Sequence, residues 1–139
     1  MINSSTIKLS KGAQKIAYLL KQSNYKFMLE YSFPDLRGRQ GVPLRYDFAI
    51  LNSNGTVRAL IEFDGEGHFN QVKFFQKNSS DFKRAQGRDR EKNKYALMHG
   101  LPLYRIPYWE IDNITTAAQL FNNKFKVKHK YHNDLLKAP

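Results

Sequence analysis

The distribution of apolar residues predicts a helix and three strands in the first half of the chain. Ser10 is suited to cap a helix that runs to about residue 24, because apolar residues between Ile16 and Leu20 gather near one side of a 3.6-residue period. The aromatic and apolar segment 26–33 predicts a strand that stops at Pro34, and the glycine-containing segment 35–43 predicts a loop. Segments 44–51 and 57–64 predict two more strands, joined as a hairpin by residues 52–55.

The second half of the chain predicts a helix between this hairpin and a further strand. Residues 65–88 are polar and basic, which predicts a loop with some short helix. Residues 89–99 predict a helix that Gly100 closes, residues 101–106 predict a strand, and Asp112 or Asn113 is expected to start a last helix. This order predicts one α/β domain over residues 1–139, with a mixed sheet flanked by helices. Its core would span about residues 10–114, and a basic helix or tail would follow from about 115 to 139.

The predicted hairpin would bring acidic side chains together. A two-residue turn at Asn54 and Gly55 places Asp47 opposite Glu62, with Asp64 two positions further along the same face. A four-residue loop would make Asp47 and Glu62 diagonal neighbours, whereas a loop of odd length or a bulge would separate them. Clustered carboxylates repel one another, and oxygen ligands favour a hard divalent cation. We therefore expect Asp47 and Glu62 to bind Mg²⁺ or Mn²⁺.

A simpler interpretation is that these acids form ion pairs with Arg45, Arg58 or nearby lysines on the sheet surface. The apolar neighbours of Glu62 argue against this interpretation; they are Leu60, Ile61 and Phe63. An acid among such residues is typical of a functional site rather than of a charged surface.

Three other residues are candidates for catalysis. His68 follows Asp64 by four residues, past two glycines, and its imidazole could accept a proton from an attacking water. Asp89 and Lys92 share a face of their predicted helix. Lys92 could neutralise charge on a scissile phosphate, while Asp89 could orient His68 or add a metal ligand. A surface or core role for His68, and a plain ion pair between Asp89 and Lys92, are the open alternatives.

Composition indicates a polyanionic partner. The chain has 23 Lys and Arg residues against 12 Asp and Glu, a net charge of +11, and such basic proteins bind nucleic acids by displacing counterions. General solubility is the alternative explanation. There is no cysteine, which excludes disulfides, thiolate nucleophiles and cysteine-based zinc sites. No segment has the apolar length of a signal peptide or membrane span, so we expect a cytoplasmic protein without a membrane partner. The expected nucleic-acid-binding residues are Arg37, Arg39, Arg45, Lys73, Lys77, Lys83, Arg84, Lys124, Lys126, Lys128 and Lys130.

The order of these motifs resembles the PD-(D/E)xK nuclease superfamily, in particular its branch of very-short-patch-repair-like and phage homing endonucleases. The resemblance covers about residues 10–114 and rests on Asp47-Phe48, the stretch IEFDGEGHF at 61–69, Asp89 to Lys92, and LPLYRIPYWE at 101–110. It implies a restriction-endonuclease-like core, Mg²⁺ held by Asp47 with help near Glu62, and hydrolysis of DNA by an activated water aided by His68. It also implies a phage or mobile-element origin, hence the cytoplasm of a host cell.

The sequence departs from the superfamily pattern at two positions. The superfamily usually has a lysine two residues after the second-strand acid, where this chain has Asp64, so the positive charge must come from Lys92 or His68 or be absent. The family also tends to carry a glutamate just after a glycine in the first helix, whereas Ala13 follows Gly12 here. Glu30 is then the candidate substitute.

The leading interpretation is a metal-dependent endonuclease that acts on DNA, preferably duplex, and a homodimer would suit double-strand cleavage. Two alternatives stay open. The departures just described favour a nuclease-fold DNA-binding protein or inhibitor without catalysis. The alternating basic and aromatic residues of segment 124–130 favour an RNA-directed nuclease, since such residues stack on unpaired bases.

Overall fold

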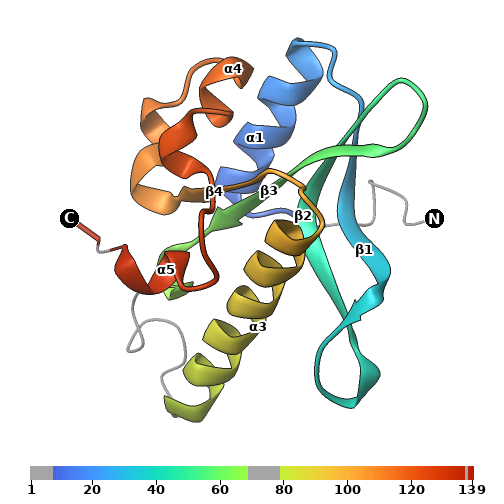
Figure 1. Cartoon of the computed structure of the whole chain (residues 1–139). Coiled ribbons are helices and arrows are strands. Elements are labelled where there is room, and N and C mark those ends of the chain that lie inside the picture. The colour runs from blue at the N-terminus through green and yellow to red at the C-terminus, as the bar shows by residue number, and fades with distance from the viewer. Residues whose placement is uncertain (1–7, 69–78, 137) are drawn as a thin grey trace.

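A four-stranded mixed sheet forms the centre of the protein (Figure 1). The computed structural model describes residues 8–68, 79–136, 138 and 139. The sheet has the order β1-β2-β3-β4 and consists of β1 (Phe27–Arg37), β2 (Pro43–Leu51), β3 (Val57–Asp64) and β4 (Leu103–Pro107). Strands β1, β2 and β3 pair antiparallel, whereas β4 runs parallel to β3. The prediction of a single α/β domain with a mixed sheet flanked by helices is confirmed.

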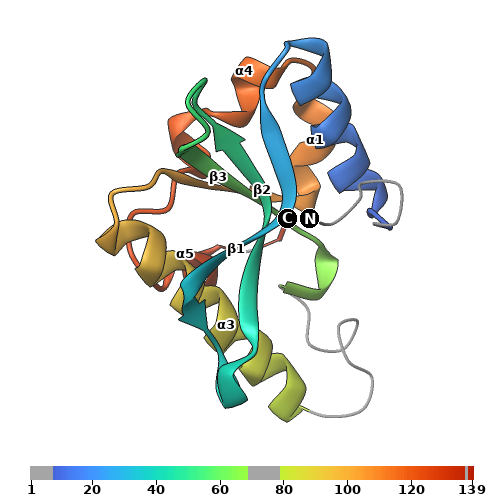
Figure 2. The same ribbon diagram turned by 90° about the vertical axis from the view of Figure 1, so that its right-hand side faces the viewer.

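Helices cover both faces of the sheet (Figures 1 and 2). On one face α1 (Lys11–Gln22) and α4 (Ala117–Leu120) pack on a core that includes Phe48 and Ile61. On the other face α3 (Ser79–Met98) packs on a core that includes Leu60 and Leu103, and α5 (His132–Leu135) contacts α3. Short 3₁₀ turns also occur in the described part of the chain: η2 (Arg39–Gly41), η3 (Glu66–His68), η4 (Tyr108–Asn113) and η5 (Asn123–Phe125).

Helix α1 forms as the sequence predicts. The amide N–H of Ala13 donates to Oγ of Ser10 (3.3 Å), which satisfies one of the free donors at the helix start. Ile16 and Leu20 are fully buried against the sheet. The apolar stripe therefore fixes which side of α1 faces the core.

Strand β1 is longer than predicted, because it continues through Pro34 as far as Arg37. Proline lacks an amide donor and is tolerated on edge strands and at irregular pairings. Both conditions hold here, since β1 is at the edge of the sheet and its register with β2 shifts between Ser32 and Arg37. The predicted loop at 35–43 is consequently reduced to the short connection around η2.

Helix α3 begins ten residues before its predicted start, so residues 79–88, for which a loop with some short helix was predicted, belong to one continuous helix. Its buried stripe consists of Ala85, Asp89, Asn93 and Ala96, which recur at helical spacing but include two polar residues. The predicted end is confirmed: Gly100 has a φ of 64°, and the amide N–H of residue 101 donates to the carbonyl of Ala96 (2.9 Å).

The last helix predicted from Asp112 or Asn113 starts later, as the short helix α4, and the segment beyond it packs along β4. Residues Asp112 and Asn113 belong to η4, and α4 starts after Thr116, whose side chain forms a capping box with Gln119. Beyond η5 the chain forms an antiparallel bridge between Lys126 and β4, and Val127 is buried in the core. Among the described residues, no helix is long and apolar enough to cross a membrane.

Candidate active site

The pairing of β2 with β3 places Asp47 opposite Glu62. The register Phe48↔Ile61 continues to this pair, as the sequence predicts, but the connection differs from the predicted two-residue turn. The amide N–H of Asn52 donates to the carbonyl of Thr56 (2.8 Å), which closes a three-residue loop, and an irregularity follows between Ile50 and Leu51. An odd loop and a bulge each shift the register by one residue, so together they restore it.

Where the two acids meet, their side-chain carboxylates accept the backbone N–H hydrogen bonds between β2 and β3. The amide N–H of Asp47 donates to Oε2 of Glu62 (2.8 Å), and the amide N–H of Phe63 donates to Oδ2 of Asp47 (2.8 Å). Glu62 is only 3% exposed. The two carboxyl groups are held in contact with each other by these reciprocal bonds. A fixed pair of carboxylates on adjacent strands is therefore part of the fold.

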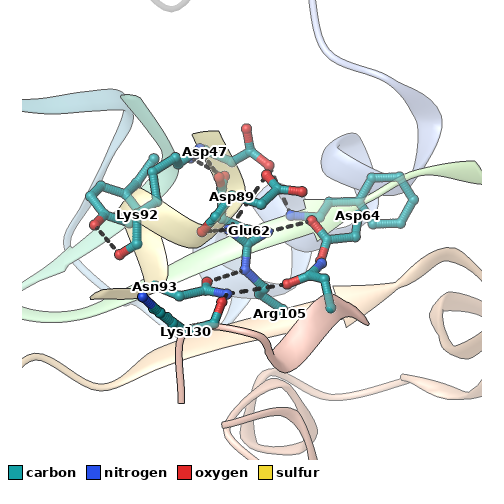
Figure 3. A network of polar contacts seen from close by, with 11 residues as sticks. Asp47, Glu62, Asp64, Asp89, Lys92, Asn93, Arg105 and Lys130 are labelled. Carbon is teal, nitrogen blue, oxygen red and sulfur yellow. Dashed lines mark hydrogen bonds and ion pairs between the residues drawn. The ribbon is translucent and has the colours of Figure 1, made fainter. Parts of the chain in front are cut away.

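Lys92 reaches this pair from α3 (Figure 3). Its Nζ forms an ion pair with Oε1 of Glu62 and lies 5.3 Å from the ring centroid of Tyr46. The hydroxyl of Tyr46 donates to the backbone carbonyl of Lys92 (2.7 Å), which fixes this turn of the helix above the sheet. The interpretation of Lys92 and Asp89 as a mutual surface ion pair is wrong, since the lysine binds Glu62 and Asp89 contacts Arg105 (3.6 Å).

The surroundings of the two acids shift their pKa values in opposite directions. Burial raises the pKa of Glu62, but the positive charges of Lys92 and Arg105 outweigh this and hold it below its usual value. Burial raises the pKa of Asp47 well above its usual value, and the negative charge of Glu62 raises it further. A further cation bound beside Asp47 would lower its pKa again, because the added positive charge offsets both the cost of burial and the repulsion by Glu62.

These acids line a cavity of about 400 Å³ between β2, β3 and α3. Basic side chains border it, and its lining residues are Pro43, Leu44, Arg45, Asp47, Glu62, Phe63, Ala85, Arg88, Asp89 and Lys92. Two adjacent carboxylates are a donor set that suits Mg²⁺ or Mn²⁺, which commonly takes one or two protein carboxylates and completes its shell with water and phosphate. Within the described part of the chain, no group of three or more His, Asp or Glu side chains is arranged to hold a metal ion. Asp47 and Glu62 are the adjacent carboxylates in this cavity that could hold a metal ion, and Asp89 also lines it.

Asp64 does not join the other two carboxylates, so the expected convergence of three is not found. Nη1 of Arg105 donates to Oδ1 of Asp64 (2.8 Å), and Nδ2 of Asn133 donates to Oδ2 (2.8 Å). Asp64 is 1% exposed and is absent from the lining of the cavity. A buried guanidinium requires an anionic partner. Asp64 therefore balances the buried charge of Arg105, and Lys92 is the cation that forms an ion pair with Glu62.

Arg105 and Asn93 are site residues that the sequence reasoning missed. Arg105 is fully buried on β4, next to Glu62 in the parallel register, and its Nε donates to Oδ1 of Asn93 (2.7 Å). Its Nη2 lies 3.6 Å from Oδ1 of Asp89, which lines the cavity (Figure 3). The sequence did contain one indication of this site, an arginine inside the short apolar strand LYRIP. A charged residue at such a buried position must have a partner of opposite charge.

Three predicted site residues cannot be placed, and a fourth lies outside the cavity. The backbone of His68 belongs to η3, but its side chain falls outside the described residues, as do Lys73 and Lys77. Glu30 lies half-buried on β1 and is not among the residues that line the cavity.

Some of the predicted nucleic-acid-binding residues line a cavity, and others do not. Arg39, Lys83 and Arg84 line a second cavity, of about 920 Å³, which shares Leu44 and Arg88 with the first. Arg45 lines the first cavity. Arg37, by contrast, donates to the carbonyls of residues 34 and 41 and so stabilises the loop between β1 and β2.

The tail lysines line neither cavity. Lys124 forms an ion pair with Glu110 (3.1 Å), Lys126 bridges to β4, and the carbonyl of Lys130 accepts a hydrogen bond from Asn93 (3.0 Å). Phe125 and Val127, the apolar residues between these lysines, are buried. The alternation in this segment thus follows from its packing against β4, which removes one argument for stacking on RNA bases.

Comparisons of the chain with known protein families, with characterised proteins and with solved structures find no match.

Proposed function

We propose that this protein is a metal-dependent endonuclease of the PD-(D/E)xK type that hydrolyses phosphodiester bonds in DNA. The observation that carries the proposal is the contact of Asp47, Glu62 and Lys92 at one cavity, with Arg45 and Arg88 at its border. Two carboxylates on adjacent strands and one lysine from α3 match the chemistry that the sequence resemblance implies. The net charge of +11 supports a polyanionic substrate.

Each residue has a distinct task in the proposed reaction. Asp47 and Glu62 would hold Mg²⁺ or Mn²⁺, which when bound supplies an activated water and neutralises phosphate charge. Lys92 offers its ammonium group to the phosphate oxygens, where negative charge develops during in-line attack. Arg45 and Arg88 would orient the flanking phosphates. Lys92 thereby takes the place of the motif lysine, whose position Asp64 occupies.

A second candidate is a DNA-binding protein of the same fold that does not cleave. The ion pair between Lys92 and Glu62 favours it, because that pair already neutralises one of the two carboxylates. The burial of Asp64 with Arg105 favours it as well, since Asp64 is not among the acids that line this cavity, and Asp89, which does line it, contacts Arg105.

Cleavage of supercoiled plasmid separates the two candidates. The protein is incubated with plasmid, linear duplex, single-stranded DNA and RNA, in Mg²⁺, in Mn²⁺ or in EDTA. We expect nicked or linear plasmid with either metal and none in EDTA. Salt-sensitive binding of the plasmid without cleavage in any metal would instead establish the second candidate, and preferential cleavage of RNA would contradict both.

A further inference from the structure

A basic groove runs along α3 beside the candidate active site. We use this name for the cavity of about 920 Å³ whose described lining residues are Gly38, Arg39, Gln40, Val42, Leu44, Ser80, Lys83, Arg84, Gly87, Arg88 and Glu91. Four of them are cationic and one is acidic, so its charge favours an anionic occupant. The ion pair of Arg84 with Asp81 (3.4 Å) lies at the surface and competes weakly, because exposed pairs contribute little.

The basic groove leads directly to the two carboxylates. Leu44 and Arg88 line both the groove and the cavity that contains Asp47 and Glu62. An elongated polyanion lying in the groove would therefore extend into the candidate active site. A small anion such as free phosphate would not need this continuity.

Gly87 keeps one face of α3 open toward the basic groove. Glycine in a helix interior destabilises it by about 0.5 to 1 kcal/mol relative to alanine. Packing against the described residues does not explain it, because a Cβ at Gly87 would meet none of their atoms within 4 Å. Gly12, the glycine of α1, differs in that a Cβ there would collide with Phe63. The bare backbone at Gly87 instead leaves space for an occupant of the groove.

The spacing of the cations suits a nucleic-acid backbone. Lys83, Arg84 and Arg88 lie on α3 over a rise of about 7.5 Å, and Gly87 lies between them. One strand of duplex DNA carries a phosphate for roughly every 3.4 Å of helix axis. This face of α3 therefore spans about two phosphates, and Arg39 faces the groove from the opposite wall.

We propose that the basic groove binds the phosphodiester backbone of one DNA strand and guides it to Asp47 and Glu62, with Gly87 as the point of closest approach to α3. The inference rests on the proposed function in its choice of DNA as the ligand. It goes beyond that function by assigning the path of the strand, and it is testable without cleavage.

Binding in EDTA tests the charge of the groove. Fluorescence anisotropy measures the affinity of a labelled 30-base-pair duplex, and of one of its strands alone, over a range of salt concentrations. The double variant Arg39→Gln/Lys83→Gln removes two groove cations, so we expect a slope of log K against log salt that is shallower by about 2. The matched control Lys128→Gln/Lys130→Gln removes two exposed tail cations, and we expect its slope to stay near that of the wild type.

Substitution of Gly87 tests the shape of the groove without changing its charge. Alanine and leucine are both strong helix formers, so both variants should fold, which circular dichroism checks. We expect Gly87→Ala to bind DNA nearly as well as the wild type, and Gly87→Leu to bind at least about tenfold more weakly because its side chain fills the groove.

Two results would overturn the assigned path even if the protein cleaves plasmid. One is an equal loss of DNA binding in the groove and tail double variants, and the other is unchanged DNA binding by Gly87→Leu. Tighter binding of an RNA of the same sequence would overturn the choice of DNA. If groove variants lose binding while the wild type cleaves nothing in any metal, the path stands and the proposed catalysis fails. Comparison of the duplex with the single strand shows which form supplies the backbone.

Discussion

At the scale of single residues, Asp47 and Glu62 show how position sets the chemistry of identical functional groups. Both are carboxylates on adjacent strands, and each accepts a backbone hydrogen bond from the opposite strand. The positive charges of Lys92 and Arg105 lower the pKa of Glu62 and so favour its ionised form. The pKa of Asp47 is raised instead, by burial and by the negative charge of Glu62. Asp47 is therefore the group that gains most from a bound cation.

The variant Asp47→Asn separates catalysis from folding. An amide has nearly the same shape and can still accept the hydrogen bond from Phe63, but it neither repels Glu62 nor binds a metal well. We expect cleavage to fall by at least about 100-fold, which plasmid nicking in Mg²⁺ measures. In EDTA we expect a higher free energy of unfolding than for the wild type, measured by urea denaturation, since a destabilising buried charge is gone. A lower free energy of unfolding would contradict the assigned repulsion.

Glu30 carries backbone strain next to the site. Its φ is 51°, in the left-handed region that costs a side-chain-bearing residue about 1 to 2 kcal/mol, and it lies inside β1 between Leu29 and Tyr31, which pair with Phe48 and Tyr46 of β2. We expect Glu30→Gly to raise the free energy of unfolding by about 0.5 to 1 kcal/mol. Glu30→Ala, which keeps the strain, is the control and should not stabilise. Urea denaturation measures the free energy of unfolding of both variants. Equal changes in the two variants would show that relief of backbone strain does not cause the stabilisation.

At the scale of elements, the hairpin could be predicted from the sequence and the full length of α3 could not. The hairpin follows from apolar runs separated by turn residues, and its acids were found because two compensating irregularities left the register intact. In α3 the inward positions 89 and 93 hold Asp and Asn, which bind Arg105 instead of packing in an apolar core. Both positions lie in the predicted helix 89–99, whereas residues 79–88 contribute only Ala85 to the buried residues that the structure describes, so their apolar periodicity was too sparse to reveal the full length of α3.

The two glycines of the helices α1 and α3 should respond in opposite ways to alanine. In α1 a Cβ at Gly12 would lie 2.3 Å from Cζ of Phe63, whose amide holds Asp47. We expect Gly12→Ala to lower the free energy of unfolding by about 1 to 3 kcal/mol and to reduce cleavage, because Phe63 must shift. Gly87→Ala, with open space around it, should raise stability by about 0.5 to 1 kcal/mol. Thermal unfolding of both variants tests this contrast. Addition of Phe63→Leu should rescue Gly12→Ala if the collision is the cause.

At the scale of the whole molecule, Arg105 connects parts of the chain that are distant in sequence. Its guanidinium binds Asp64 on β3 and contacts Asp89 on α3, while Asn133 of α5 donates a hydrogen bond to Asp64. Asn93 joins the same network and also binds the carbonyl of Lys130 (Figure 3). The network fixes α3 relative to the sheet, and thereby fixes the reach of Lys92 to Glu62. The C-terminal segment is thus a structural support of the site.

This support should depend on pH through His132 at the start of α5. Burial and the positive charge of Arg105 lower the pKa of His132 to about 4, from the usual value of 6.5. Below pH 6.5 the unfolded chain binds a proton that the folded chain excludes, so stability is lost as the pH falls from about 6.5 toward 4. His132→Gln should remove this part of the loss, seen as a smaller decrease in urea midpoint between pH 7 and pH 5 than in the wild type. His99→Gln, at an exposed position, is the matched control, and an equal effect of both substitutions would show that α5 does not sense pH through its proximity to Arg105.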